Sequence, residues 1–187
     1  SSSTSEAYKG SHAAYLQTQK GKKVFGFFLV PVFAGSMFRG KFQLKGGDFL
    51  ASAMFGQAHP KEAGKPVHFK GYYKYQPGSV YYDENDNIIA GKIDECSIYA
   101  IMYKVTKGSI GTPNDEFLDE SNVMSSDKAI AKAILQDRSA KSEYTEFSIP
   151  LTYSEEPDYD RYDYKLAIVF SSSVEGDFYR GAVGSTL

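Results

Sequence analysis

Paired acidic residues are the first candidates for chemistry in this sequence, because glycoside hydrolysis requires two carboxyl groups that face one substrate. Adjacent acids occur as Asp94 and Glu95, Asp115 and Glu116, Asp119 and Glu120, and Glu155 and Glu156. Neighbouring side chains of a strand point to opposite faces, so Asp94 and Glu95 cannot act together. The other pairs fall in expected loops, where solvated charge is the ordinary outcome. A pair drawn from distant segments stays open, but the sequence shows no recognisable catalytic constellation.

Other chemistry-bearing motifs are missing from the sequence. His12, His59 and His68 lack the spacing of a transition-metal site, and no nucleophile elbow or phosphate-binding glycine motif accompanies them. The run 83–87 is rich in oxygen ligands, but it lacks the glycine and terminal glutamate of a calcium loop, so a hairpin turn is favoured. We therefore expect no cofactor; calcium stays possible, at no position that the sequence identifies.

A tyrosine-rich face is the stronger candidate for a ligand site. Side chains alternate between the two faces of a strand, and strands are expected over 67–76, 94–106 and 165–171. If these strands share a sheet, its outer face carries Tyr72, Lys74, Glu95, Tyr99, Tyr103 and Lys165. Aromatic rings stack on pyranose C–H faces while charged groups pair with hydroxyls, so this mixture predicts sugar binding. The alternative is a tyrosine face covered by a loop or by a neighbouring domain.

A second candidate site lies in the loop that follows the 165–171 strand. Asp177 and Arg180 in this loop could reach a ligand at the edge of a sandwich. The polar segment 107–127 is also long for a connection, and such loops are either functional or disordered.

Period-2 alternation dominates the chain, and glycines interrupt it at the spacing typical of sandwiches. Further strands are expected over 12–19, 23–30, 36–44 and 143–153, with a last one from about Gly184. The run 126–136 has helical propensity but also alternates, and we favour a strand there because its surroundings are all β. The fold class predicted is an all-β, antiparallel β-sandwich of the jelly-roll type.

Composition sets the broad class of protein. The chain has 187 residues, with 21 basic and 23 acidic side chains, which argues against nucleic-acid binding. No apolar run is long enough for membrane insertion. We expect residues 1–12 to be a linker or the start of a first strand, and residues 13–187 to form one domain. The serine-rich start resembles a trimmed linker, so any targeting signal would have preceded it.

Several segments together resemble one family: GKFQLKGGDF (40–49), FKGYYKYQPG (69–78), DECSIYAIMYKV (94–105), YTEFSIPLTY (144–153) and KLAIVFSSSVEGDFYRGAVGSTL (165–187). From about Ala13 to the end, the chain looks like the putative carbohydrate metabolism domain family, a C-terminal module of exported Bacteroidetes proteins. The resemblance implies a jelly roll similar to galactose-binding-like and carbohydrate-binding modules. It also implies a cell-surface or periplasmic location behind an upstream domain. Family members usually begin earlier and continue beyond Leu187, which leaves any calcium site unplaced.

These observations predict a non-catalytic carbohydrate-binding domain. One alternative is a glycoside hydrolase or another carbohydrate-active enzyme. Another is a structural or adhesive domain whose tyrosine face meets a protein.

Overall fold

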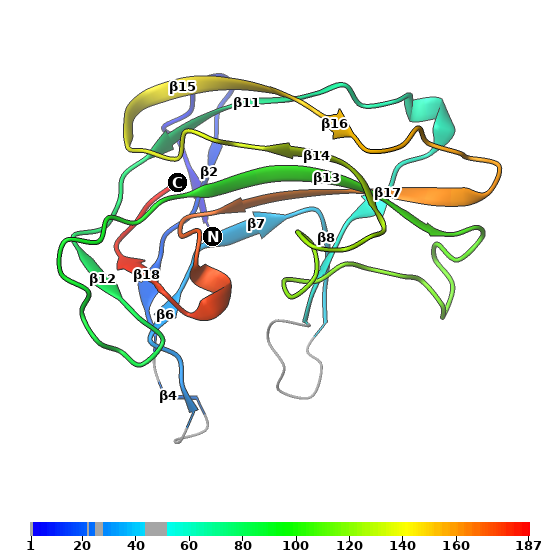
Figure 1. Cartoon of the computed structure of the whole chain (residues 1–187). Coiled ribbons are helices and arrows are strands. Elements are labelled where there is room, and N and C mark those ends of the chain that lie inside the picture. The colour runs from blue at the N-terminus through cyan, green and yellow to red at the C-terminus, as the bar shows by residue number, and fades with distance from the viewer. Residues whose placement is uncertain (1, 22, 25–27, 44–51) are drawn as a thin grey trace.

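The structure is a computed structural model that describes residues 2–21, 23–24, 28–43 and 52–187 (Figure 1). Its main sheet is antiparallel and has the strand order β10–β17–β13–β14–β16, with β7 also pairing with β17. The bounds of these strands are β7 Ser36–Phe38, β10 Gln57–Ala58, β13 Ser97–Thr106, β14 Ala129–Ile134, β16 Thr152–Tyr153 and β17 Tyr162–Ser171. The long pair β13–β17 is in register over its whole length and forms the centre of the molecule.

A second layer, β11 (His68–Tyr75) and β15 (Lys141–Pro150), lies over one face of the main sheet (Figure 1). The ring of Phe69 bridges the two layers, because it packs edge-on against Phe147 in β15 and Phe170 in β17. Apolar side chains around these rings form a core in which Ile98 and Met102 of β13 are fully buried. This arrangement confirms the predicted all-β sandwich.

The opposite face of the main sheet is covered as well. Loop 107–127 and the pair β8 (Gly40–Phe42) and β9 (Ala53–Phe55) pack on it, and the Phe55 amide donates to the Leu118 carbonyl over 2.7 Å. A second core therefore forms below β13, from Tyr99, Ile101 and Tyr103. Because β13 is buried on both faces, its alternation does not separate a solvent side from a core side.

Shorter pairs complete the described part of the chain. They are β1 (Ser2–Thr4) with β2 (Ala13–Tyr15), β3 (Gln19–Lys20) with β6 (Val32–Phe33), β4 (Lys23–Val24) with β5 (Phe28–Leu29), and β12 (Val80–Tyr82) with β18 (Gly181–Val183). Two short 3-10 turns, η2 (Lys61–Ala63) and η3 (Gly176–Phe178), are also present. In these ranges no helix has the length and apolar character needed to span a membrane.

Most predicted strands are found, with shifted boundaries. The ambiguous run 126–136 contains β14, whose ladders with β13 and β16 outweigh its helical propensity. The last named strand, β18, ends before Gly184, and the strand predicted from that glycine is found only as isolated antiparallel bridges of Thr186 with Gln17 and Gln76. Parts of the predicted strands 23–30 and 36–44 lie outside the described residues.

Candidate functional site

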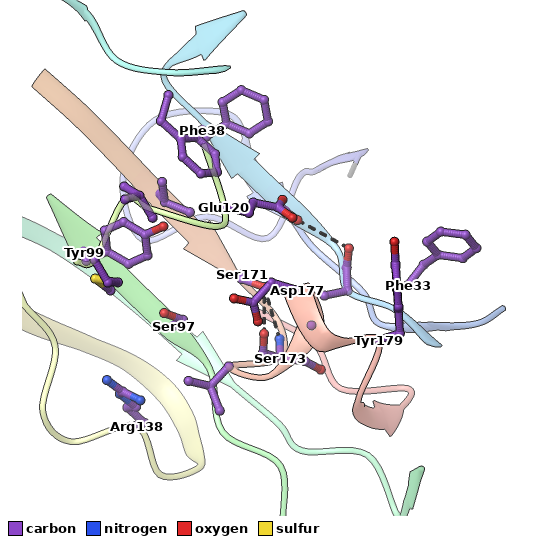
Figure 2. Close-up of a pocket in the computed structure, with 18 of the residues that line it drawn as sticks. Phe33, Phe38, Ser97, Tyr99, Glu120, Arg138, Ser171, Ser173, Asp177 and Tyr179 are labelled. Carbon is purple, nitrogen blue, oxygen red and sulfur yellow. Dashed lines mark hydrogen bonds between the residues drawn. The ribbon is translucent and has the colours of Figure 1, made fainter. Parts of the chain in front are cut away.

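A cavity of about 470 Å³ opens on the loop-covered face of the main sheet. Five elements meet there: the start of β13, the end of β17, strand β7, loop 107–127 and the η3 turn (Figure 2). The cavity is here called the carboxyl pocket, after Glu120 of the loop and Asp177 of η3, which both line it. Its volume lies within the range of roughly 300–1,000 Å³ that is usual for small-molecule sites.

The two carboxyl groups of the pocket are incompletely satisfied by the described part of the chain, where Asp177 accepts hydrogen bonds from backbone amides of its own turn. No side chain or amide there donates a hydrogen bond to Glu120, and no cation pairs with either acid. The Oδ1 atom of Asp177 is buried and has no hydrogen-bond partner among those residues. Arg138 also lines the cavity, but it lies on the far side from Glu120 (Figure 2). The pocket therefore presents acceptors whose donors must come from a ligand or water.

Burial raises the pKa of both acids. Burial raises the pKa of Glu120 to about 7, and the charges of Asp177 and Asp119 contribute to the rise. Burial also raises the pKa of Asp177, and the backbone amides of Asp177 and Phe178 offset only part of this. A carboxyl group that stays protonated near neutral pH can donate a proton, which an ordinary surface glutamate cannot do.

A buried ion pair positions the loop that carries Glu120. Lys165 of β17 is 1% exposed, and its ammonium donates to the Asp115 carboxylate over 2.5 Å and to the Glu116 carbonyl over 2.6 Å. The same ammonium lies 3.2 Å from the centre of the Phe117 ring. Glu116 is itself held by Lys128 and by the Thr106 amide, which together lower its pKa to about 2. The long polar loop is thus anchored to the sheet.

The η3 turn that carries Asp177 is held in a similar way. Ser173, just before it, donates to the buried Asp94 carboxylate over 2.5 Å, and the Ser185 hydroxyl and Ala182 amide bind the same oxygen. Gly176 approaches the chain so closely that an added Cβ would lie 2.4 Å from the Cβ of Ala34. Only glycine permits this contact, which brings η3 against the segment between β6 and β7.

Aromatic rings and hydroxyls make up the remaining walls. Phe33 and Phe42 are 40% and 61% exposed, and Phe38 packs edge-on against Phe55 at 5.0 Å. Hydroxyl groups come from Ser97, Ser171 and Tyr99, among others. Flat rings beside carboxyl and hydroxyl groups suit a ligand with both C–H faces and polar groups.

The predicted outer tyrosine face does not exist. Tyr99 is 7% exposed and Tyr103 is fully buried, with its hydroxyl donating to the Phe55 carbonyl, and Lys165 is buried with Asp115. The reason is that loop 107–127 and β9 cover this side of β13, which is the alternative that the sequence left open. Tyr99 nevertheless lines the carboxyl pocket.

The other nominated residues lie in four separate places. Tyr72 and Lys74 belong to β11 in the second layer, so they do not share a sheet with β13. Glu95 is exposed just before β13. Asp177 reaches the carboxyl pocket, whereas Arg180 pairs with Glu84 over 2.6 Å outside it.

Glu120 is the functional candidate that sequence reasoning missed. The sequence shows Glu120 beside Asp119 in an expected loop, and acids in loops are predicted to be solvated. The available signal was the length of loop 107–127 together with its apolar residues Leu118 and Val123, both of which are buried. Within the described ranges, no group of three or more metal-ligating side chains gathers.

The fold and the pocket define a class: an antiparallel β-sandwich domain with a ligand-sized cavity between its loops. Within that class, the chain belongs to the family described as the putative carbohydrate metabolism domain, whose sequence profile matches residues 1–187. Among curated proteins, none matches the chain.

Two solved structures from Bacteroides share this fold. A protein of Bacteroides thetaiotaomicron VPI-5482, called a putative glycoside hydrolase, is 30% identical with a TM-score of 0.83 over 98% of this chain and 53% of its own. A protein of Bacteroides vulgatus ATCC 8482 with the same description is 28% identical, with a TM-score of 0.84 over 99% of this chain and 72% of its own. The chain thus spans about half the length of the first structure.

Proposed function

We propose that this chain is a carbohydrate-binding domain and that the carboxyl pocket is its sugar site. The observation that carries the proposal is the pair of acids, Glu120 and Asp177, which face a cavity with aromatic walls and have no cation partner among the described residues; the Oδ1 atom of Asp177 also has no hydrogen-bond donor there. Membership of a carbohydrate metabolism family supports the choice of ligand.

Sugar hydroxyls can donate the hydrogen bonds that the acids of this pocket do not receive from the described residues. A buried acceptor without a donor costs about 1–3 kcal/mol, so a ligand hydroxyl that donates to Asp177 Oδ1 gains by satisfying it. Rings such as Phe33 and Phe42 can hold the C–H face of a pyranose at the mouth. An apolar ligand would leave the carboxyls unsatisfied, and an anionic ligand would be repelled by them.

The family also supports a setting for the domain. We propose that it acts in an exported protein, at the cell surface or in the periplasm, beside a further domain of the same protein. Export can be tested by fractionating cells that produce the full-length protein and locating the domain with an antibody.

Titration calorimetry against soluble hexasaccharides tests the binding site. Glu120→Gln and Asp177→Asn should each weaken binding about tenfold or more, because a hydrogen bond to a charged group contributes about 1.5–3 kcal/mol. Asp127→Asn is the matched control, since Asp127 is an exposed acid at the end of the same loop. Affinity that survives both pocket variants would contradict the assignment.

Glycoside hydrolysis is the second candidate, and the raised pKa of Glu120 favours it. A glutamic acid with a pKa of about 7 beside a second carboxyl fits the pattern in which one group protonates the glycosidic oxygen and the other assists at the anomeric carbon. In this scheme Glu120 donates the proton, and Asp177 acts as base or nucleophile. The two Bacteroides structures are described as putative glycoside hydrolases, which supports testing it.

Product release from a panel of polysaccharides separates the two candidates. Hydrolysis predicts reducing ends released by the wild type, and about 10²–10⁴-fold less by Glu120→Gln, the usual range for losing a general acid. The rate should also fall as pH rises through 7, as Glu120 loses its proton. Binding without any product release would leave the domain as a binding module.

A further inference from the structure

A second cavity, of about 510 Å³, lies on the other face of the main sheet. It is bounded by β1 and β2, by β11 and β15, and by the chain end at Leu187. We call it the Tyr72 cleft; Glu6, Tyr15, Tyr72, Lys74, Lys141 and Tyr144 are among the residues that line it. Nothing in the proposed function uses these residues.

Strand alternation shows that the Tyr72 cleft is separate from the carboxyl pocket. Along β7, Ser36 and Phe38 line the carboxyl pocket, whereas Met37 between them lines the Tyr72 cleft. Along β17, Ser171 lines the carboxyl pocket and its neighbour Phe170 the Tyr72 cleft. Adjacent side chains of a strand point to opposite faces, so the cavities lie back to back across one sheet.

Flat aromatic surface is available in the cleft. Tyr15 is 37% exposed and Tyr72 is 40% exposed, which is unusual for large rings that line a cavity. Tyr8 already stacks on one face of Tyr72, with ring centres 3.8 Å apart and planes 15° apart, so a ligand must use the part of the Tyr72 ring that stays exposed. The hydroxyl of Tyr144 donates to the Glu6 carbonyl over 2.7 Å, which ties the segment between β1 and β2 to β15. A rigid, exposed ring is the kind of surface on which a pyranose stacks.

The charges of the Tyr72 cleft are already paired. Lys74 binds Glu6 at 2.5 Å, and Lys141 binds Asp137 at 2.7 Å. A charged ligand would have to displace one of these pairs, whereas a neutral ligand with hydroxyl groups can add hydrogen bonds at their edges. This pairing distinguishes the cleft from the carboxyl pocket, whose acids have no cation partner among the described residues.

We propose that the Tyr72 cleft is a second carbohydrate site, which holds a neutral, extended glycan against the rings of Tyr15 and Tyr72. The inference rests on the carbohydrate role proposed above, but not on the carboxyl pocket. Two sites on opposite faces allow one domain to hold two glycan segments, and linked binding of this kind raises the apparent affinity for a polymer.

Calorimetry with cellohexaose, xylohexaose, mannohexaose and maltohexaose tests the proposal. At least one of them should bind the wild type at two sites. The Glu120→Gln/Asp177→Asn double variant should keep the second site, because it leaves the Tyr72 cleft intact. Adding Tyr72→Ala should weaken that remaining site about tenfold or more, and Tyr72→Phe should keep it, because only the ring is needed for stacking. Tyr162→Ala is the control, since Tyr162 lines neither cavity.

Tyrosine fluorescence gives an independent readout. The chain has 15 tyrosines and no tryptophan, so tyrosine emission is not masked, and ligand stacking on Tyr72 should change it. No hexasaccharide binding to the double variant, or unchanged binding after Tyr72→Ala, would overturn the second site. Loss of all binding in the double variant would keep the proposed function and refute only the second site. Loss of all wild-type binding on Tyr72→Ala alone would keep the second site and refute the assignment of the carboxyl pocket as a sugar site.

Discussion

Replacing Glu120 by glutamine should stabilise the domain at neutral and alkaline pH. The folded protein holds the proton of Glu120 up to a pKa of about 7, whereas an unfolded chain releases it near the ordinary value of 4.5. Between these values the folded state binds more protons, so stability falls as pH rises through this window. Above pH 7 the burial penalty is fully present in the wild type, and glutamine does not carry it.

The size of the effect follows from the two pKa values. A pKa rise from 4.5 to about 7 corresponds to about 3 kcal/mol of lost stability, since each unit is worth about 1.4 kcal/mol. Glutamine resembles the protonated acid in shape, so Glu120→Gln and the wild type should be equally stable at pH 4.5. At pH 8 the variant should be about 3 kcal/mol more stable, equivalent to a melting temperature about 6–12 °C higher.

Urea denaturation at pH 4.5 and pH 8, followed by circular dichroism, measures this difference. Asp127→Asn again serves as the control, because Asp127 is an exposed acid of the same loop that does not line the carboxyl pocket. Two results would refute the reasoning: a Glu120→Gln curve parallel to the wild type at both pH values, or a variant that is less stable at pH 8.

Three structural predictions follow from buried contacts, two beside the carboxyl pocket and one in the β11–β15 layer. Lys165→Met removes the buried cation from the Asp115 carboxylate and leaves it only the exposed Lys41 at 3.6 Å as a cation partner among the described residues. The variant should cost about 3 kcal/mol in urea denaturation at pH 7. Adding Asp115→Asn should recover part of this loss, and no recovery would contradict the ion-pair account. Asp94→Ala removes the acceptor of Ser173, Ser185 and the Ala182 amide and should cost about 3 kcal/mol. It should also speed hydrogen exchange at Ala182; unchanged exchange would contradict the role. Gly71→Ala places a Cβ 2.7 Å from the Phe147 ring and should cost about 1–3 kcal/mol in thermal unfolding, whereas a neutral result would show that the ring can move.

The strands could be predicted from sequence because alternation and turn residues act locally. Ser97–Thr106 is rich in aromatic and β-branched residues, and its assignment as a strand needed nothing else. The residues of this strand do not by themselves determine which of its two faces is exposed to solvent. Tyr99 and Tyr103 are amphipathic, so they fit a wet face or a buried one, and the outcome depended on where loop 107–127 packed.

The carboxyl pocket could be predicted only in part for a related reason. Asp177 was nominated because its loop follows a predicted strand and therefore reaches the edge of the sandwich. The sequence could not pair Glu120 with Asp177, because the two acids are far apart in the chain. They line one cavity because the ion pair between Lys165 and Asp115 fixes the loop that carries Glu120. Lys165 is predicted from sequence to bind a ligand, whereas in the structure its buried ammonium binds Asp115 and holds loop 107–127.

The hydrogen-bond partners of the buried polar groups differ between the contacts that support the pocket and the pocket itself. The buried Asp94 accepts several hydrogen bonds, and Lys165 has three partners around its ammonium, so these groups stabilise the fold. Glu120 and Asp177 stand a few residues from these anchors, yet neither has a cation partner in the described chain. A cation partner from the protein itself would make the folded state more stable, and the Glu120→Gln prediction measures how much stability the unpaired Glu120 costs. In the proposed function, a ligand supplies the donor that Asp177 Oδ1 lacks in the described chain.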